Sequence, residues 1–363
     1  MVRKRTSILG ALLVLSALLF VVPLAHADYD PLGSGSTKFS LDKGFLGLMK
    51  QNGVKVSAVA PASLKGTTVT FPVSGGTFDP VAAKGTVEHE GALLFKAGSR
   101  SIPLKSWQLK TTQKHSPISV KVGGGQLKLG AAKSLAISRE GFGDKVKVST
   151  LSLSAKVAGR LGKKLHLKNV FKEGELLGST LTKANPITIT VLGQGKVQLN
   201  LDPGIVAKLN SLFVATNPIF PAEHQGPQFT LPIFGGTIAP DGSLGTIETQ
   251  GALEFLQLGG GQVFWREPWL DLAGKDLNAE VDAEPTPPYS GKVGRVPIAG
   301  LTFSAPAVAN AKARTVTVTG ATLALDAATA ASFNEVFAKP QGKANVFVAG
   351  ETLASVSFVA QGQ

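Results

Sequence analysis

Histidine is the residue type in this sequence best suited to hold a metal or a cofactor, and it is scarce. The sequence has five histidines and no cysteine, which excludes disulfides and thiolate sites. His89 stands between Glu88 and Glu90. A strand would direct His89 to one face and both glutamates to the other, so we expect no metal site from these three residues. The histidines beyond the N-terminal segment are His89, His115, His166 and His224.

The familiar catalytic motifs are absent from the sequence. It contains no G-x-S-x-G elbow, no H-E-x-x-H helix motif and no Gly-Lys-Ser/Thr phosphate loop. A carboxylate pair at Asp42 and Asp202 is conceivable, but both residues stand where helix caps are expected. The sequence therefore predicts no catalytic residues, no metal site and a protein that is not an enzyme.

One stretch of sequence occurs twice and defines the organisation of the chain. Residues Gly66–Phe95 match Gly226–Phe255 without a gap, at an offset of 160. A shared period this long predicts two tandem copies of one domain. No histidine recurs at this offset, and Thr249 stands at the position of His89. A duplicated histidine site is therefore excluded.

Four short helices are predicted, one pair bracketing each copy. Each begins with a leucine followed by Asp or Ser, and mostly apolar or small residues recur four, five and eight positions after the leucine. Asp and Ser are preferred N-cap residues. The four starts are Leu41-Asp42, Leu153-Ser154, Leu201-Asp202 and Leu325-Asp326.

Between these helices the pattern changes to the period of β-strands. Val69, Phe71 and Val73 alternate with other residues, and Pro72 within that run favours an edge strand or a bulge. Gly75-Gly76 is typical of a turn. Similar short runs continue through both copies, and the predicted fold class is all-β. We expect a mainly antiparallel sandwich or open barrel with short capped helices, in two tandem copies.

The N-terminus has the pattern of a secretory signal peptide. Basic residues at positions 3–5 precede the apolar run Ile8–Leu24 and the cleavage motif Ala25-His26-Ala27. An uncleaved membrane anchor is the alternative. We expect a secreted, extracellular protein of the cell envelope without a transmembrane segment in the mature chain. The predicted divisions are a signal peptide at 1–27, a flexible lead-in at 28–37, copy one at 38–194 and copy two at 195–363.

The two copies differ in charge. The whole chain carries a net charge of +13. Residues 28–195 hold 24 Lys and Arg against 10 Asp and Glu, whereas residues 196–363 hold 10 against 14. A basic first copy predicts contact with a polyanion such as an anionic cell-wall polymer. Solubility and attraction between the copies are the alternative explanation. Nucleic acid is not expected, because aromatic and basic residues are not interleaved.

The repeated stretch resembles the HtaA domain. The resemblance lies in FPVSGGTFDP…GTVEHEGALLF and its second copy LPIFGGTIAP…GTIETQGALEF. It implies a tandem-domain, cell-surface protein of an actinobacterial haem-uptake family, with haem or a haemoprotein as partner. In that family a tyrosine near the domain start holds the haem iron, supported by a histidine that His89 matches here. The domain starts carry no tyrosine; they have Phe39, Phe45, Leu199 and Ile205, and the only tyrosines are Tyr29 and Tyr289.

Three tryptophans complete the candidate residues. Trp107 and Trp269 stand at nearly equivalent places, and Trp265 lies close to Trp269. They predict either a stacking surface for a porphyrin or sugar, or core packing. The sequence thus favours a secreted, non-enzymatic binding protein with haem as a cofactor contacted by His89. The alternative is an adhesion or envelope-structural protein that docks on anionic wall polymers through its basic copy.

Overall fold

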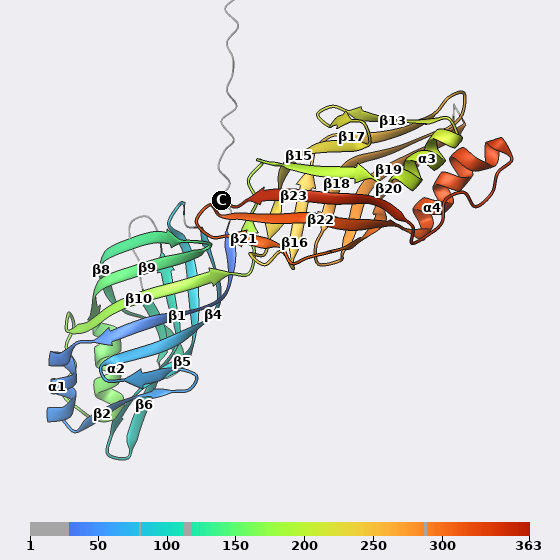
Figure 1. Cartoon of the computed structure of the whole chain (residues 1–363). Coiled ribbons are helices and arrows are strands. Elements are labelled where there is room, and N and C mark those ends of the chain that lie inside the picture. Colours follow the sequence, from blue (N-terminus) through green and yellow to red (C-terminus); the bar gives the residue numbers. More distant parts are fainter. Residues whose placement is uncertain (1–28, 80, 112–117, 123, 287–288) are drawn as a thin grey trace, which may run out of the picture.

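The computed structural model describes residues 29–79, 81–111, 118–122, 124–286 and 289–363. The predicted signal peptide and His115 lie outside these residues. The described chain forms two antiparallel sheets, one for each copy of the repeat. Figure 1 shows them as two separate bodies that meet near Gln363.

The first sheet closes into an eight-stranded barrel, which we call barrel one. It closes because β4 pairs with β1 on one side and with β5 on the other. The short strands β2 (Val54–Val59) and β3 (Ser63–Lys65) extend it. The barrel strands are β1 (Asp30–Leu41), β4 (Thr68–Asp79), β5 (Lys84–Ala97), β6 (Arg100–Thr111), β7 (Ile118–Val122), β8 (Gly125–Glu140), β9 (Gly143–Leu153) and β10 (Leu176–Pro186).

The second sheet closes in the same way and forms barrel two. Here β15 pairs with β12 and β16, and β16 pairs with β18. The shorter strands β11 (Ile189–Thr190), β13 (Val214–Ile219), β14 (Glu223–Gln225), β17 (Ala252–Gln257) and β21 (Val308–Asn310) lie off the closed path. The barrel strands are β12 (Lys196–Leu201), β15 (Gln228–Ile238), β16 (Gly245–Thr249), β18 (Gln262–Asp271), β19 (Asp276–Thr286), β20 (Tyr289–Thr302), β22 (Thr315–Leu325) and β23 (Thr352–Gln361).

The predicted fold class is confirmed, and the sheets prove to be closed rather than open. The tandem arrangement is also confirmed, because β16 and β17 together occupy the place of β5. Closure gives every wall strand a paired neighbour on both sides along at least part of its length. Each barrel surrounds its own cluster of buried apolar side chains.

All four predicted helices form, and each begins at the predicted cap. They are α1 (Lys43–Gln51), α2 (Ala155–Leu165), α3 (Pro203–Ser211) and α4 (Ala327–Phe333). The cap side chains of Asp42, Ser154, Asp202 and Asp326 accept hydrogen bonds from backbone N–H groups at the helix starts. After α4 the chain continues in the π-helix η1 (Asn334–Ala338) and the 3₁₀-helix η2 (Lys339–Gln341). Figure 1 shows the helices at the barrel ends distant from the junction.

The repeated Gly-Gly pair does not form the turn that the sequence predicted. Gly75 and Gly76 lie inside β4, next to a shift in register between Val73 and Gly75. Gly76 has a φ of 117°, and a Cβ there would lie 2.0 Å from the carbonyl oxygen of Thr86. The pair therefore permits a bulge and a close approach of two strands, which curves the wall. The same geometry recurs at Gly236.

Two segment predictions are also corrected. Residues 30–37, predicted as part of a flexible lead-in, belong to β1. The second sheet begins with β11 at Ile189, a few residues before the predicted boundary at 194. β19 runs to Thr286 and so includes the start of the proline-rich stretch 284–289, while Pro287 and Pro288 lie outside the described residues. Among the described residues, no helix combines the length and apolar character needed to cross a membrane.

Candidate functional site

His89 lies inside barrel one. Its residue is 6% exposed and stands on β5, opposite Val73 of β4 and Trp107 of β6. The ring Nδ1 lies 3.0 Å from the carbonyl oxygen of Trp107, and Nε2 lies 2.6 Å from Oγ1 of Thr37. Both nitrogens of the ring are therefore engaged within the protein.

These contacts fix the tautomer of His89. A carbonyl oxygen can only accept, so Nδ1 carries the proton and Nε2 accepts from the Thr37 hydroxyl. Thr37 in turn lies 2.6 Å from the hydroxyl of Thr182. Burial lowers the pKa of His89 from 6.5 to about 4, while the hydrogen bond to the Trp107 carbonyl opposes that shift. His89 is thus a neutral member of a buried hydrogen-bonded chain at neutral pH.

The space beside His89 is too small for a porphyrin. The cavity that His89 lines with Thr37 and Trp107 measures about 10 Å³, which is room for about one water molecule. The structure therefore favours His89 as a core residue with satisfied hydrogen bonds, rather than as a direct haem contact. The Trp107 ring fills this region, 4.7 Å from Phe71 between centroids.

The register corrects the expected equivalence of the tryptophans. Lys105 pairs with Ala92, and Arg266 pairs with the matching Ala252, so Trp107 corresponds to Pro268 rather than to Trp269. The Thr249 hydroxyl donates to the carbonyl oxygen of Pro268, which reproduces the His89 contact in barrel two. Trp107 and Trp265 pack in the barrel cores. Trp269 is half-buried, with the guanidinium of Arg295 over its ring at 4.2 Å.

The tyrosines do not supply the missing family ligand within the described structure. Tyr29 is 44% exposed and lies ahead of β1, and Tyr289 begins β20, distant in sequence from either domain start. His224 is exposed on β14, with its ring 5.6 Å from that of Phe229.

His166 lines a large groove in barrel one, which sequence reasoning did not single out. It is the C-cap of α2, is exposed, and adopts a left-handed conformation with a φ of 57°. The groove beside it has a volume of about 660 Å³. Lys163 and Lys168 line the same groove, and Phe171 contributes an aromatic ring. An imidazole, two ammonium groups and an apolar surface therefore meet at one concave site.

Barrel two fills the equivalent position. Counting from the helix caps Ser154 and Asp326, His166 corresponds to Ala338, which is fully buried in η1. Val336 and Phe337 of η1 are buried there as well. The chain beyond α4 thus continues in helical form and packs on the core, where barrel one instead has the groove.

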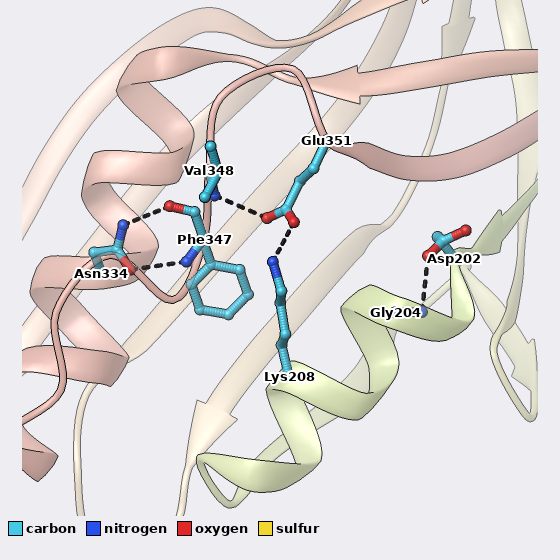
Figure 2. Close-up of polar contacts among 7 residues, drawn as sticks. All are labelled: Asp202, Gly204, Lys208, Asn334, Phe347, Val348 and Glu351. Carbon is cyan, nitrogen blue, oxygen red and sulfur yellow. Dashed lines mark hydrogen bonds and ion pairs between the residues drawn. The ribbon is translucent and has the colours of Figure 1, made fainter.

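Barrel two has a different groove, of about 490 Å³, between α3 and β13. It is lined by Val206, Leu209, Val214 and Pro227 among others, and none of its described lining residues is histidine, tyrosine, methionine or lysine. Figure 2 shows how α3 is held: Lys208 forms an ion pair with Glu351. This groove offers apolar contact but no ligand for iron.

The loop that receives Lys208 is fixed by polar contacts of its own. Glu351 accepts a hydrogen bond from the backbone N–H of Val348 at 2.9 Å. Asn334 exchanges two hydrogen bonds with the backbone of Phe347, at 2.8 and 3.0 Å. The loop after η2 is therefore tied to the α4–η1 segment as well as to α3.

Comparison with known proteins finds similarity among solved structures only. No protein-family model and no curated protein matches this sequence. Among solved structures, the C-terminal domain of HtaA from Corynebacterium glutamicum is 18% identical and covers 48% of this chain and 98% of its own, with a TM-score of 0.38. The N-terminal domain of the same HtaA is 15% identical and covers 48% and 99%, with a TM-score of 0.36.

A third solved structure is similar in the same way. The heme binding protein HtaB from the same organism is 14% identical and covers 49% of this chain and 96% of its own, with a TM-score of 0.34. Each match spans about one copy of the repeat. The similarity to HtaA domains that the sequence predicted is thus found again among solved structures. At these identities the likeness concerns the fold alone.

Proposed function

We propose that this chain is a non-enzymatic, secreted binding protein of the cell envelope that takes up haem through the groove beside His166. The single observation that carries this proposal is the meeting of His166, Lys163 and Lys168 at a groove of about 660 Å³. That volume lies in the ordinary range of small-molecule sites, about 300–1,000 Å³. Heme binding by the similar HtaB is consistent with it.

The groove suits the two chemical ends of haem. A histidine nitrogen is an ordinary axial ligand for haem iron, and the exposed ring of His166 can reach a ligand without breaking a buried network. The haem propionates are anions, which the ammonium groups of Lys163 and Lys168 would attract. Phe171 offers an aromatic surface to the porphyrin. His89 fails the same comparison, because both of its nitrogens are engaged and its cavity is small.

The proposal includes export. The basic, apolar and A-x-A regions of residues 1–27 support secretion, although they lie outside the described structure. Because barrel two has Ala338 at the place of His166, the proposal implies one haem for each chain.

Titration of the chain from Asp28 onward with haemin tests the proposal. We expect a Soret shift that saturates at one haem per chain. His166→Ala should weaken binding at least tenfold and change the spectrum, because it removes the axial ligand. Lys163→Ala and Lys168→Ala should each weaken binding about two- to fivefold, as expected for exposed ion pairs.

His89→Thr is the matched control, since it introduces the residue of barrel two. Binding by this variant should equal that of the parent chain. Loss of the Soret shift in His89→Thr with retention in His166→Ala would move the ligand to His89 and overturn the groove. No Soret shift in the parent chain would overturn haem binding itself.

A further inference from the structure

Four lysines lie together on the outer wall of barrel one, and we call them the lysine face. They stand on three neighbouring strands, and three of them are exposed while Lys145 is half-buried. Figure 1 shows β9, β10 and β1 side by side on the barrel. The lysine face comprises Lys38 of β1, Lys145 and Lys147 of β9, and Lys183 of β10.

The strand register arranges these lysines in two adjacent rows. In one row Lys145 pairs directly with Lys183. In the next row Leu181 pairs with Lys147 on one side and with Lys38 on the other. Neighbouring strands lie about 4.8 Å apart and the two rows about 7 Å apart. The lysine face therefore presents four cations within the width of three strands.

This arrangement does not help the barrel to fold. Like charges directly opposite each other on neighbouring strands destabilise a sheet. The lysine face forms an ion pair with Glu140, whose carboxylate lies 2.8 Å from Nζ of Lys183. Both side chains are about half exposed. Hydrogen bonding and charge from Lys183, with a contribution from Lys145, hold the pKa of Glu140 below its usual value.

Barrel two shows that the fold does not require these lysines. Its register places Thr317 opposite Val359 where barrel one has Lys145 opposite Lys183. Gln198 stands at the position of Lys38. The same wall is thus uncharged at all three positions. The lysines are a property of barrel one rather than of the shared scaffold.

We propose that the lysine face is a docking surface for a linear polymer with closely spaced phosphodiester groups. Lysine ammonium groups bind phosphate as point charges, and hydroxyls flank them in the same row: Ser138 pairs with Lys145, and Ser36 pairs with Lys183. The large apolar side chains exposed on barrel one lie outside the two rows, and Leu181 within the second row is half-buried. The face therefore exposes no large apolar side chain that could insert into a lipid layer. This inference does not depend on haem binding.

Binding of the chain from Asp28 onward to polyglycerol phosphate tests the inference. We expect binding that weakens steeply between low and physiological salt, because exposed charges are screened over about 8–10 Å. The double variant Lys145→Thr, Lys183→Val introduces the residues of barrel two. It should weaken binding about tenfold, because each of the two substitutions removes one attractive contact between a lysine and the polymer.

A second lysine pair provides a control with the same change in charge. Lys55 and Lys96 also stand opposite each other, on β2 and β5, and barrel two has Ala215 and Leu256 there. Lys55→Ala, Lys96→Leu should alter binding less than about twofold if the lysine face is the site. Equal weakening by both double variants would reduce the effect to net charge and overturn the inference.

Two further outcomes would also overturn it. One is tighter binding to vesicles of anionic phospholipid than to the polymer, which would point to a membrane surface. The other is equal binding to hyaluronate, whose carboxylates are widely spaced, because phosphodiester spacing would then have no role. Thermal unfolding of both double variants provides the folding check, and neither should lose stability, since each removes a like-charge pair.

Discussion

The two barrels share a scaffold but differ inside at one layer of side chains. Barrel one holds a chain of polar groups there, running from Thr182 through Thr37 to His89 and the carbonyl of Trp107. Barrel two is apolar at three of the four side-chain positions of this layer. In register, His89, Thr37, Thr182 and Thr180 correspond to Thr249, Val197, Phe358 and Val356.

This difference separates what the fold needs from what barrel one adds. Barrel two closes with Val197 and Phe358 in its wall, so the fold does not depend on a buried polar chain. Burying polar groups costs free energy unless each finds a partner. The lysine face on the outer wall and the His166 groove at the helix end also occur in barrel one alone. The fold therefore does not depend on them either. The His166 groove and the lysine face, the two features for which binding is proposed, therefore both lie in barrel one.

The largest expected effect is the loss of stability caused by a substitution in the core of barrel one. Trp107 is 4% exposed, lies within 5.5 Å of the rings of Phe39 and Phe71, and donates its indole N–H to the carbonyl oxygen of Leu104. Trp107→Ala should lower the stability of barrel one by about 3–5 kcal/mol. Differential scanning calorimetry should show one of two transitions shifting to lower temperature.

Trp265→Ala is the matched change in barrel two. Trp265 packs on Phe255 and stacks on Phe333 with centroids 5.5 Å apart, so its loss should shift the other transition by a similar amount. If either variant moves a single transition of the whole chain, the barrels are one cooperative unit and the comparison fails.

A second test concerns a buried carboxyl near the junction of the barrels. Asp144 is 3% exposed, and burial raises its pKa from 3.8 to about 7, opposed by the charge of Arg139 and assisted by Asp30 and Asp79. Barrel two has Val316 at this position. The folded chain therefore keeps a proton that the unfolded chain releases between about pH 4 and 7. Stability from this group is lost as pH rises through that interval.

Asp144→Asn should remove this loss. Relative to the parent chain, the variant should gain about 4 kcal/mol between pH 4 and pH 8, from about three pKa units. Urea unfolding at both pH values measures the difference. Glu140→Gln is the control, because it removes an exposed carboxyl whose pKa Lys183 lowers rather than raises. A parent chain and Asp144→Asn with parallel pH profiles would show that Asp144 is ionised at pH 4 to 7.

The sequence predicted the elements whose causes are local. A capping side chain bonds to N–H groups two or three residues away, so Asp42 and Asp202 could be assigned from a few letters each. Strand alternation likewise separated His89 from Glu88 and Glu90, which lie on the other face of the strand. Closure could not be predicted in this way, because it depends on which distant strands pair, such as β4 with both β1 and β5.

The candidate sites show the same limit. His166 was visible as a histidine, but its groove depends on the chain leaving the helix after α2 while η1 continues it after α4. Lys38 and Lys183 lie far apart in the sequence, and the register alone places them on neighbouring strands.

The last prediction concerns His89. Its contribution to stability depends on pH with the opposite sign to that of Asp144. Because the pKa of His89 is lowered to about 4, the unfolded chain binds a proton between pH 6.5 and 4 that the folded chain does not. The stability that His89 contributes is therefore complete above pH 6.5 and is lost as pH falls toward 4, by about 3 kcal/mol.

His89→Thr should remove this pH dependence, because Thr249 performs the equivalent contact in barrel two without titrating. Urea unfolding at pH 4.5 and 7 should show the variant losing less stability on acidification than the parent chain, whatever its absolute stability. Equal losses in both chains would mean that His89 takes up its proton without disturbing the fold. The polar chain in barrel one would then be open enough to bind a ligand. The argument that His166 rather than His89 is the haem ligand would no longer hold.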